Sequence, residues 1–310
     1  MKKLIILLAL CISSISFAED IPYLLTASAR GDLATVNAML QSGADANTKD
    51  ADDITALMYA ARKDRTDVVT ALLKKGADIN AKDKGGWTAL MFAARKNHVK
   101  TVTVLLSSGA DPKIRDESGW SAFGMASTSG YSEVVNLMIK HGMDANAKAD
   151  DGKTALMYAA KSGDVPTINS LISQGANANT HDKQGATALM YAVREGHNDA
   201  VNFLLAHGAI VDDIDQSRWT ALTWAVKKSQ VPIAQSLVAN GADVNHKDSQ
   251  GTPLLQLAVD TSSLQLVKLL LANKANLKAR DKYGLTPYVY ALKKGNTQIV
   301  NLLKDAGGTY

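Results

Sequence analysis

The sequence is poor in cysteine and in aromatic residues. Cys11 is the single cysteine among 310 residues, and Phe, Trp and Tyr together make up 5% of the chain. Cys11 lies in an N-terminal segment that we expect to be removed, so the mature chain would contain no thiol for disulfide bonds or catalysis. No apolar run approaches the roughly 20 residues that a membrane-spanning helix requires. We therefore expect no membrane insertion of the mature form.

Concentrated charge and catalytic motifs are also missing. The formal net charge is +4, and it falls to +2 without Lys2 and Lys3, which is far from the basic face of a nucleic-acid-binding domain. The sequence has no Gly-rich phosphate loop, no Gly-x-Ser-x-Gly elbow and no His-x-x-x-His pair. Adjacent acids such as Asp52 and Asp53 fall in predicted turns, where solvated carboxylates are ordinary. We predict no enzyme activity, no cofactor, no metal site and no nucleic-acid partner.

The N-terminal segment has the order of a signal peptide. A lysine pair is followed by an apolar segment, Leu4–Ile12, and then by a small-x-small pattern that ends at Ala18. This order predicts cleavage after Ala18 and export of the mature chain. Cys11 offers a lipoprotein alternative, but Leu10 is too large for the position before a lipidated cysteine. We expect a periplasmic protein, with secretion as the alternative.

The rest of the chain repeats with a period of 33 residues. One glycine recurs at this interval, at Gly43, Gly76, Gly109, Gly142, Gly175, Gly208 and Gly241. A hydroxyl residue keeps the same interval, at Thr55, Thr88, Ser121, Thr154, Thr187 and Thr220. Lys274 replaces the next glycine, and near Thr252 the register slips by one residue and is recovered by Ala258. The period indicates about nine copies of one structural unit.

Each unit contains the signals of a turn and two helices. A segment such as 83–86 (Asp-Lys-Gly-Gly) has turn chemistry, and the following threonine is a helix N-cap. An Ala-Ala pair in the first helix permits close packing of its neighbour. Pro166 and Pro232 mark the first turn of second helices, where a missing N–H costs nothing. The Gly-Ala-Asp that follows predicts a left-handed C-cap.

These units resemble the ankyrin repeat, whose signature includes Thr-Pro-Leu-His-x-Ala and Gly-Ala-Asp-x-Asn. The nearest matches are 252–254 (Thr-Pro-Leu), 286–287 (Thr-Pro) and 241–245 (Gly-Ala-Asp-Val-Asn). The resemblance implies an all-α solenoid of helix-turn-helix units, joined by β-hairpin-like loops that project from a curved stack. We predict a signal peptide over 1–18 and one domain over 19–310. Its units are 19–49 (N-cap), 50–82, 83–115, 116–148, 149–181, 182–214, 215–247, 248–280 and 281–310 (C-cap).

Local departures from the pattern concern the ends and three non-glycine residues. Ser28 in the first unit and Lys304 in the last place polar side chains where inner units are often apolar, as expected for solvent-facing caps. Asp53, Asp64 and Lys274 replace glycines of the pattern. We expect their units to be the least regular.

Partners of such proteins usually lie along the hairpin tips and the inner helices, and two columns of residues there are candidates for binding. The first is basic and lies near the end of each inner helix, with candidates Arg62, Arg95, Lys96, Lys161, Arg194 and Lys227. It would speed encounter with an acidic partner. Two alternatives stay open: helix C-termini favour cations through the backbone dipole, and hairpin acids such as Asp83 and Asp116 could neutralise the column.

The second column precedes the inner-helix threonine. Its candidates are Ile54, Trp87, Trp120 and Trp219. Aromatic residues beside arginines are typical of interface hot spots, although each ring could instead cover a Lys or Arg side chain of its own unit. A third column contains Tyr59, Phe92, Tyr158, Tyr191, Trp224 and Tyr290. We expect it to pack between helices.

Three functions are compatible with these features. The first is a monomeric, non-catalytic scaffold or adaptor in the bacterial periplasm. It would bind a partner protein, such as one with an acidic face, along the concave groove. The second is a periplasmic inhibitor or immunity protein that uses the same groove to occlude an enzyme or toxin. A secreted, host-directed effector is the third, with less support because no further module accompanies the leader.

Overall fold

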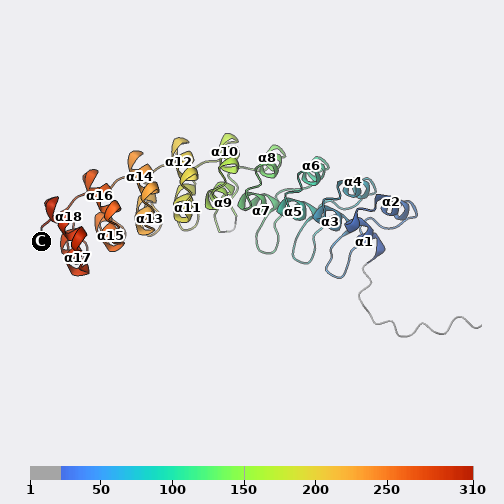
Figure 1. Ribbon diagram of the computed structural model, residues 1–310. Helices are drawn as coiled ribbons and strands as arrows, with labels where there is room; N and C mark the ends of the chain where they lie inside the picture. Colours follow the sequence, from blue (N-terminus) through green and yellow to red (C-terminus); the bar gives the residue numbers. More distant parts are fainter. Residues whose placement is uncertain (1–21, 150, 310) are drawn as a thin grey trace, which may run out of the picture.

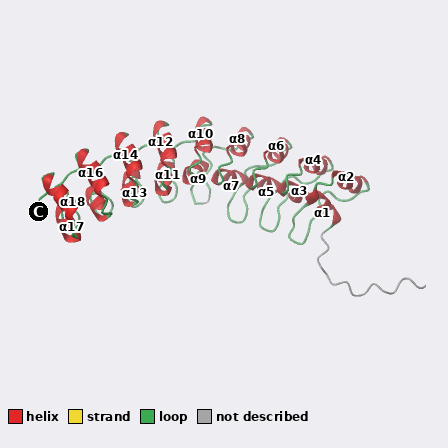
Figure 2. Cartoon of the chain, in the orientation of Figure 1, coloured by secondary structure: helices red, strands yellow, loops and turns green. Residues whose placement is uncertain are grey.

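The computed structural model describes residues 22–149 and 151–309, so the predicted signal peptide lies outside the described residues. The described residues form eighteen helices in nine helix-turn-helix pairs and contain no strand, only isolated antiparallel bridges such as Lys49 with Thr55. Figures 1 and 2 show the pairs stacked into an arch. Its underside carries the odd-numbered helices and the hairpin loops. The predicted all-α solenoid with hairpin-like loops is therefore confirmed.

The inner helices line the concave side of the arch. They are α1 Tyr23–Arg30, α3 Ala56–Arg62, α5 Ala89–Arg95, α7 Ala122–Thr128, α9 Ala155–Ser162, α11 Ala188–Glu195, α13 Ala221–Lys227, α15 Leu254–Asp260 and α17 Pro287–Lys294. The outer helices form the second layer. They are α2 Leu33–Gln41, α4 Thr66–Lys74, α6 Val99–Ser107, α8 Ser132–Lys140, α10 Val165–Ser173, α12 Asn198–Ala206, α14 Val231–Ala239, α16 Leu264–Ala272 and α18 Thr297–Asp305. In Figure 1 the helices are seen end-on near α2 and side-on near α16, so the stack twists along its length.

Hydroxyl side chains begin most of the inner helices, as predicted. The N-cap oxygen accepts a hydrogen bond from the backbone N–H three residues later, at 3.3 Å in the pair Thr55–Met58, which satisfies a donor that the helix itself leaves unpaired. At α15 the N-cap is Pro253, 33 residues after Thr220. The repeat therefore does not slip near Thr252: the backbone keeps its spacing and loses the side-chain cap. Pro166 and Pro232 both lie in the first turn of their helices.

The three non-glycine departures keep the glycine conformation. Asp53, Asp64 and Lys274 have φ of 62°, 56° and 64°, close to the left-handed values of the glycines they replace. The helices of their units have the ordinary lengths of seven residues for α3 and nine for α4 and α16. The expectation that these units would be the least regular is therefore wrong. A left-handed residue other than glycine is strained, and the surrounding stack holds it in place.

The core runs continuously through the stack. Small residues such as Ala60 and Ala61 are fully buried between inner helices, and larger ones such as Leu72 and Val69 fill the space toward the outer layer. Ser28 lies in the position that corresponds to Ala61 and is also fully buried, and its hydroxyl has no hydrogen-bond partner among the described residues. Ser28 is thus not part of a solvent-facing cap, because the second inner helix covers it. Lys304 is exposed, as a C-terminal cap requires.

Side chains also bond consecutive units together. Asn146 donates to the carbonyl of Gly175 at 2.9 Å and accepts from the N–H of Asn177 at 2.7 Å. Lys148 donates to the carbonyl of His181, 33 residues away, at 2.9 Å, and Lys247 makes the equivalent bond. These bonds satisfy backbone groups that the helix ends and hairpins leave open. They fix each unit against the next.

Candidate functional site

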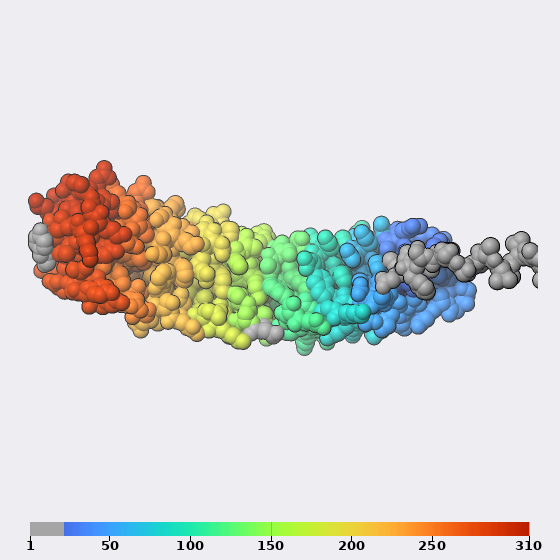
Figure 3. Space-filling view, turned by 90° about the horizontal axis from the view of Figure 1, so that it is seen from below, coloured from blue at the N-terminus to red at the C-terminus, as the bar shows by residue number. Residues whose placement is uncertain are grey.

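The candidate residues all lie on the concave side, in the hairpins or in the last turn of the inner helices. Figure 3 views the molecule from this side, where the units form one uninterrupted surface from end to end. Arg62 and Arg95 lie in the last turns of α3 and α5, and Lys96 follows as a C-cap residue. Lys161, Arg194 and Lys227 take the same place in α9, α11 and α13, in each case within the last turn. The structure therefore brings the two predicted columns together on one face.

Trp87 is half-buried and packs within its own unit. Its ring centroid is 5.0 Å from that of Phe92, and the guanidinium of Arg95 lies 5.2 Å from the centroid of the Trp87 ring. Its backbone N–H donates to Oδ1 of Asp83 at 2.8 Å. The interpretation of Trp87 as a ring beneath an arginine of its own unit is thus correct, and part of the indole still faces the groove.

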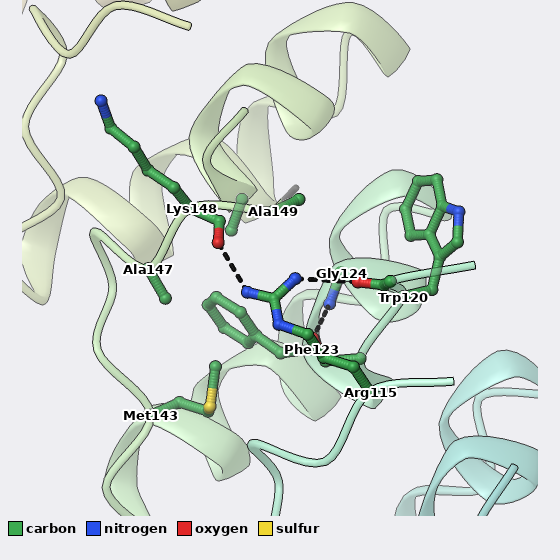
Figure 4. Close-up of a pocket in the computed structure, with 11 residues that line it drawn as sticks. Arg115, Trp120, Phe123, Gly124, Met143, Ala147, Lys148 and Ala149 are labelled. Atoms are coloured by element: carbon green, nitrogen blue, oxygen red, sulfur yellow. Dashed lines mark hydrogen bonds between the residues drawn. The ribbon is translucent and has the colours of Figure 1, made fainter. Parts of the chain in front are cut away.

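Trp120 packs on the next unit. Its ring centroid lies 5.0 Å from that of Tyr158, because Met125 occupies the ring position of its own unit. Its ring also approaches Gly124, where neighbouring units have methionine. A cavity of about 30 Å³ borders this glycine and Arg115 (Figure 4), room for about one water molecule.

Trp219 belongs to a larger aromatic cluster. Its ring is 4.5 Å from that of Trp224 in an edge-on arrangement. The Arg194 guanidinium of the preceding unit lies 4.6 Å from the Trp224 ring and 5.6 Å from the Tyr191 ring. Trp224 also donates from Nε1 to Oδ2 of Asp215 at 3.0 Å. Arg194 is half-buried as a result, and this cluster ties two units together.

The hairpin aspartates do not form ion pairs with the basic column in the described part of the chain. Oδ1 of Asp50 accepts from the N–H groups of Asp52 and Ile54, both at 2.9 Å, and Oδ2 accepts from the hydroxyl of Tyr59 at 2.8 Å. The same pattern joins Asp182 to Tyr191 at 2.7 Å. Half-buried Ile54 and the hydroxyls of Tyr59 and Tyr191 are therefore parts of the hairpin framework.

These bonds change the acidity of the tyrosines. Burial and the hydrogen bond to Asp50 raise the pKa of Tyr59, and the same two causes, with Asp182 as the acceptor, raise the pKa of Tyr191. Both phenols stay neutral at ordinary pH and keep donating. The third column thus packs between units, as expected, and positions the hairpins as well.

The basic column differs between its two ends. Arg62, Lys63, Arg95 and Lys96 are exposed, and within the described residues no carboxylate lies within 4.0 Å of any of them. We call these four residues the N-terminal basic patch.

Four lysines lie at the other end of the column, and two of them pair with one acid. Lys227, Lys228, Lys293 and Lys294 form what we call the C-terminal basic patch. Asp260 accepts from Nζ of Lys294 at 2.7 Å and lies 3.8 Å from Nζ of Lys227. The hydrogen bond from Lys294 lowers the pKa of Asp260, and the same bond raises the pKa of Lys294.

Several of these partnerships were not anticipated from the sequence. Asp260 is an acid in the basic column of the sequence, but its two lysine partners are 33 and 34 residues away. Lys148 and Lys247 each donate to a backbone carbonyl 33 residues later, in the next hairpin. Their spacing in the repeat could have identified them. Most other units have an aromatic residue at the position of Met125. This difference could likewise have indicated that the ring of Trp120 packs on an aromatic residue of the next unit.

Two histidines also connect neighbouring units. The rings of His98 and His197 lie 3.3 and 3.0 Å from backbone carbonyls 36 residues earlier, at the ends of inner helices. The described residues contain no cluster of three or more potential metal ligands. Within the same residues, no helix has the length and apolar character of a membrane span.

A stack of identical helix-turn-helix units with projecting hairpins defines a helical repeat protein of the solenoid class. Comparison with family models matches the family described as Ankyrin repeats (3 copies) at residues 24–116, 108–182, 156–248 and 232–309. The chain therefore belongs to the ankyrin-repeat family, whose repeats generally mediate protein–protein interaction and are typically non-catalytic. A search of curated proteins found no match.

Proposed function

We propose that the protein is a non-catalytic scaffold or adaptor of the bacterial periplasm that holds a partner protein along its concave face. The observation that carries this proposal is the combination of half-buried indoles and exposed cations on one face, namely Trp87 beside Arg95, with Trp120 at the equivalent position of the next unit. Such rings lose little conformational freedom on binding and offer large contact areas. The signal-peptide pattern before Ala18 supports export.

The binding face is tested by capture of partners from an envelope extract. The wild-type mature protein should retain at least one protein that the double variant Trp87→Ala with Trp120→Ala retains about tenfold less, because truncation of a hot-spot ring costs about 1–2 kcal/mol. Tyr283→Ala is the matched control, since Tyr283 is an exposed ring at the hairpin between α16 and α17, far along the stack. Circular dichroism checks that the variants stay folded. Equal capture by both variants would refute the role of these two rings.

Localisation and mode of action need separate measurements. Cell fractionation should place the full chain in the periplasm, and a variant that lacks residues 2–18 should stay in the cytoplasm. The captured partner, if it is an enzyme, is then assayed with and without the protein. Unchanged or improved turnover supports a scaffold, whereas complete loss of turnover supports the inhibitor alternative.

A further inference from the structure

The N-terminal basic patch collects four positive charges on two adjacent units. Arg62 and Lys63 end α3, Arg95 and Lys96 end α5, and these two inner helices pack directly on each other. All four side chains are exposed. None of them lies within 4.0 Å of a carboxylate of the described residues, so no ion pair there neutralises them. The macrodipoles of α3 and α5 end at the same place and offset this positive charge only in part.

An apolar surface borders this patch. Phe92 and the Arg95 guanidinium both pack against the indole of Trp87, and Asp83 accepts a hydrogen bond from its backbone N–H. The ring is half-buried and therefore pre-positioned. A ligand that contacts both features would carry negative charge and an apolar side chain close together.

The C-terminal basic patch has the same residue types in the same column but a different charge balance. Its lysines also lie at the C-terminal ends of inner helices, α13 and α17, so the helix dipole does not distinguish the two patches. Asp260, from the unit between them, forms ion pairs with Lys227 and Lys294 and accepts from the hydroxyl of Tyr290 at 2.9 Å. An acidic ligand at this patch would have to compete with a carboxylate that is already in place.

We propose that the N-terminal basic patch binds an acidic segment of the partner protein, with an apolar residue of that segment on Trp87, and that Asp260 excludes the same segment from the C-terminal patch. This inference rests on the proposed function and assigns the chemistry and position of the contact. Carboxylates opposite Arg62 and Arg95 would form charge-assisted hydrogen bonds. Electrostatic attraction acts over about 30 Å at 0.01 M ionic strength and about 8 Å at physiological ionic strength, so it would chiefly accelerate association.

The test uses the folded mature chain and a defined probe. The probe is a fluorescein-labelled oligoglutamate peptide with one central leucine, and its anisotropy is followed at low ionic strength. The double variant Arg62→Glu with Arg95→Glu should weaken binding about tenfold or more. Lys227→Glu with Lys293→Glu is the matched control in the same column, and it should change binding less than about twofold. Arg62→Gln with Arg95→Gln should give an intermediate loss.

Two further arms examine the apolar contact and Asp260. Replacing the central leucine of the peptide by glycine should weaken binding to the wild type about threefold and leave binding to Trp87→Ala unchanged. The variant Asp260→Asn releases Lys227 and Lys294, and it should add a second site for the peptide. A single site in Asp260→Asn would overturn the role given to Asp260.

Other outcomes overturn the inference as a whole. These are no binding by the wild type, equal loss in both charge-reversal variants, or a DNA oligonucleotide that binds as tightly as the peptide with the same response to the variants. The last outcome would indicate a general polyanion surface. If an envelope partner depends on Trp87 and Trp120 but not on Arg62 and Arg95, the acidic-segment inference fails and the proposed function stands. If no partner is captured at all, the proposed function fails.

Discussion

The two ends of the concave face use similar residues in different ways. Near α5, Trp87 and Arg95 contact each other and Phe92, and the cations around them have no carboxylate partner in the described chain. Near α13, Trp224 and Arg194 are joined to Trp219, Tyr191 and a hairpin carboxylate. The same residue types therefore stabilise the stack at one end and stay available for a ligand at the other. Membership of a column does not decide which role a residue has.

The largest expected difference between the ends is in stability. Trp224→Ala should lower the free energy of unfolding by about 3 kcal/mol, because it removes a ring, a platform for Arg194 and the partner of Asp215. Trp87→Ala removes a ring without a hydrogen bond and should cost about 2 kcal/mol. Urea unfolding followed by circular dichroism measures both. A greater loss for Trp87→Ala would reverse the comparison.

The tyrosine–aspartate bonds give a smaller effect. Tyr191→Phe leaves Oδ2 of the largely buried Asp182 without its donor and should cost about 1.5 kcal/mol. Tyr59→Phe removes a bond to the more exposed Asp50 and should cost about 0.5 kcal/mol. The two variants differ from the wild type by one hydroxyl each, so thermal unfolding compares them directly. Equal losses would show that hairpin burial does not matter.

Asp260 should contribute less still, and its contribution should depend on pH. Because the Lys294 contact lowers the pKa of Asp260 below its ordinary value of 3.8, the unfolded chain binds the proton more readily than the folded chain. The stabilisation is then fully present above that ordinary value and is lost as pH falls through the lower folded-state pKa. Asp260→Asn should cost about 0.5 kcal/mol at pH 7 and progressively less as pH falls below 3.8. A constant difference across this range would contradict the ion-pair assignment.

The smallest expected effect on stability comes from the N-terminal basic patch. Arg95→Glu with Lys96→Glu should change the unfolding free energy by only about 0.5 kcal/mol or less, because both side chains are exposed. The same variant should slow association with an acidic partner about tenfold at low ionic strength and much less at high salt. Stopped-flow measurements test this. An unchanged on-rate would remove these two residues from the binding surface.

The reach of sequence reasoning differs from feature to feature. Caps such as Thr55 and left-handed glycines such as Gly43 were predictable because they act within a few residues of the chain. The expectation that Ser28 faces solvent in the N-terminal cap was wrong, because its burial depends on the neighbouring helix α3. The prediction of a register slip near Thr252 was wrong because the backbone spacing, rather than the position of the hydroxyl, sets the start of α15.

The sequence by itself determined the period and most of the helix caps, since both follow from local turn and cap chemistry repeated every 33 residues. Only the tertiary structure decided which partners the side chains of the concave face meet. It paired Asp260 with Lys294, turned Trp120 toward Tyr158 and left Arg62 and Arg95 without a carboxylate partner among residues 22–149 and 151–309. These contacts join side chains on different units, and their geometry depends on how the units stack and twist.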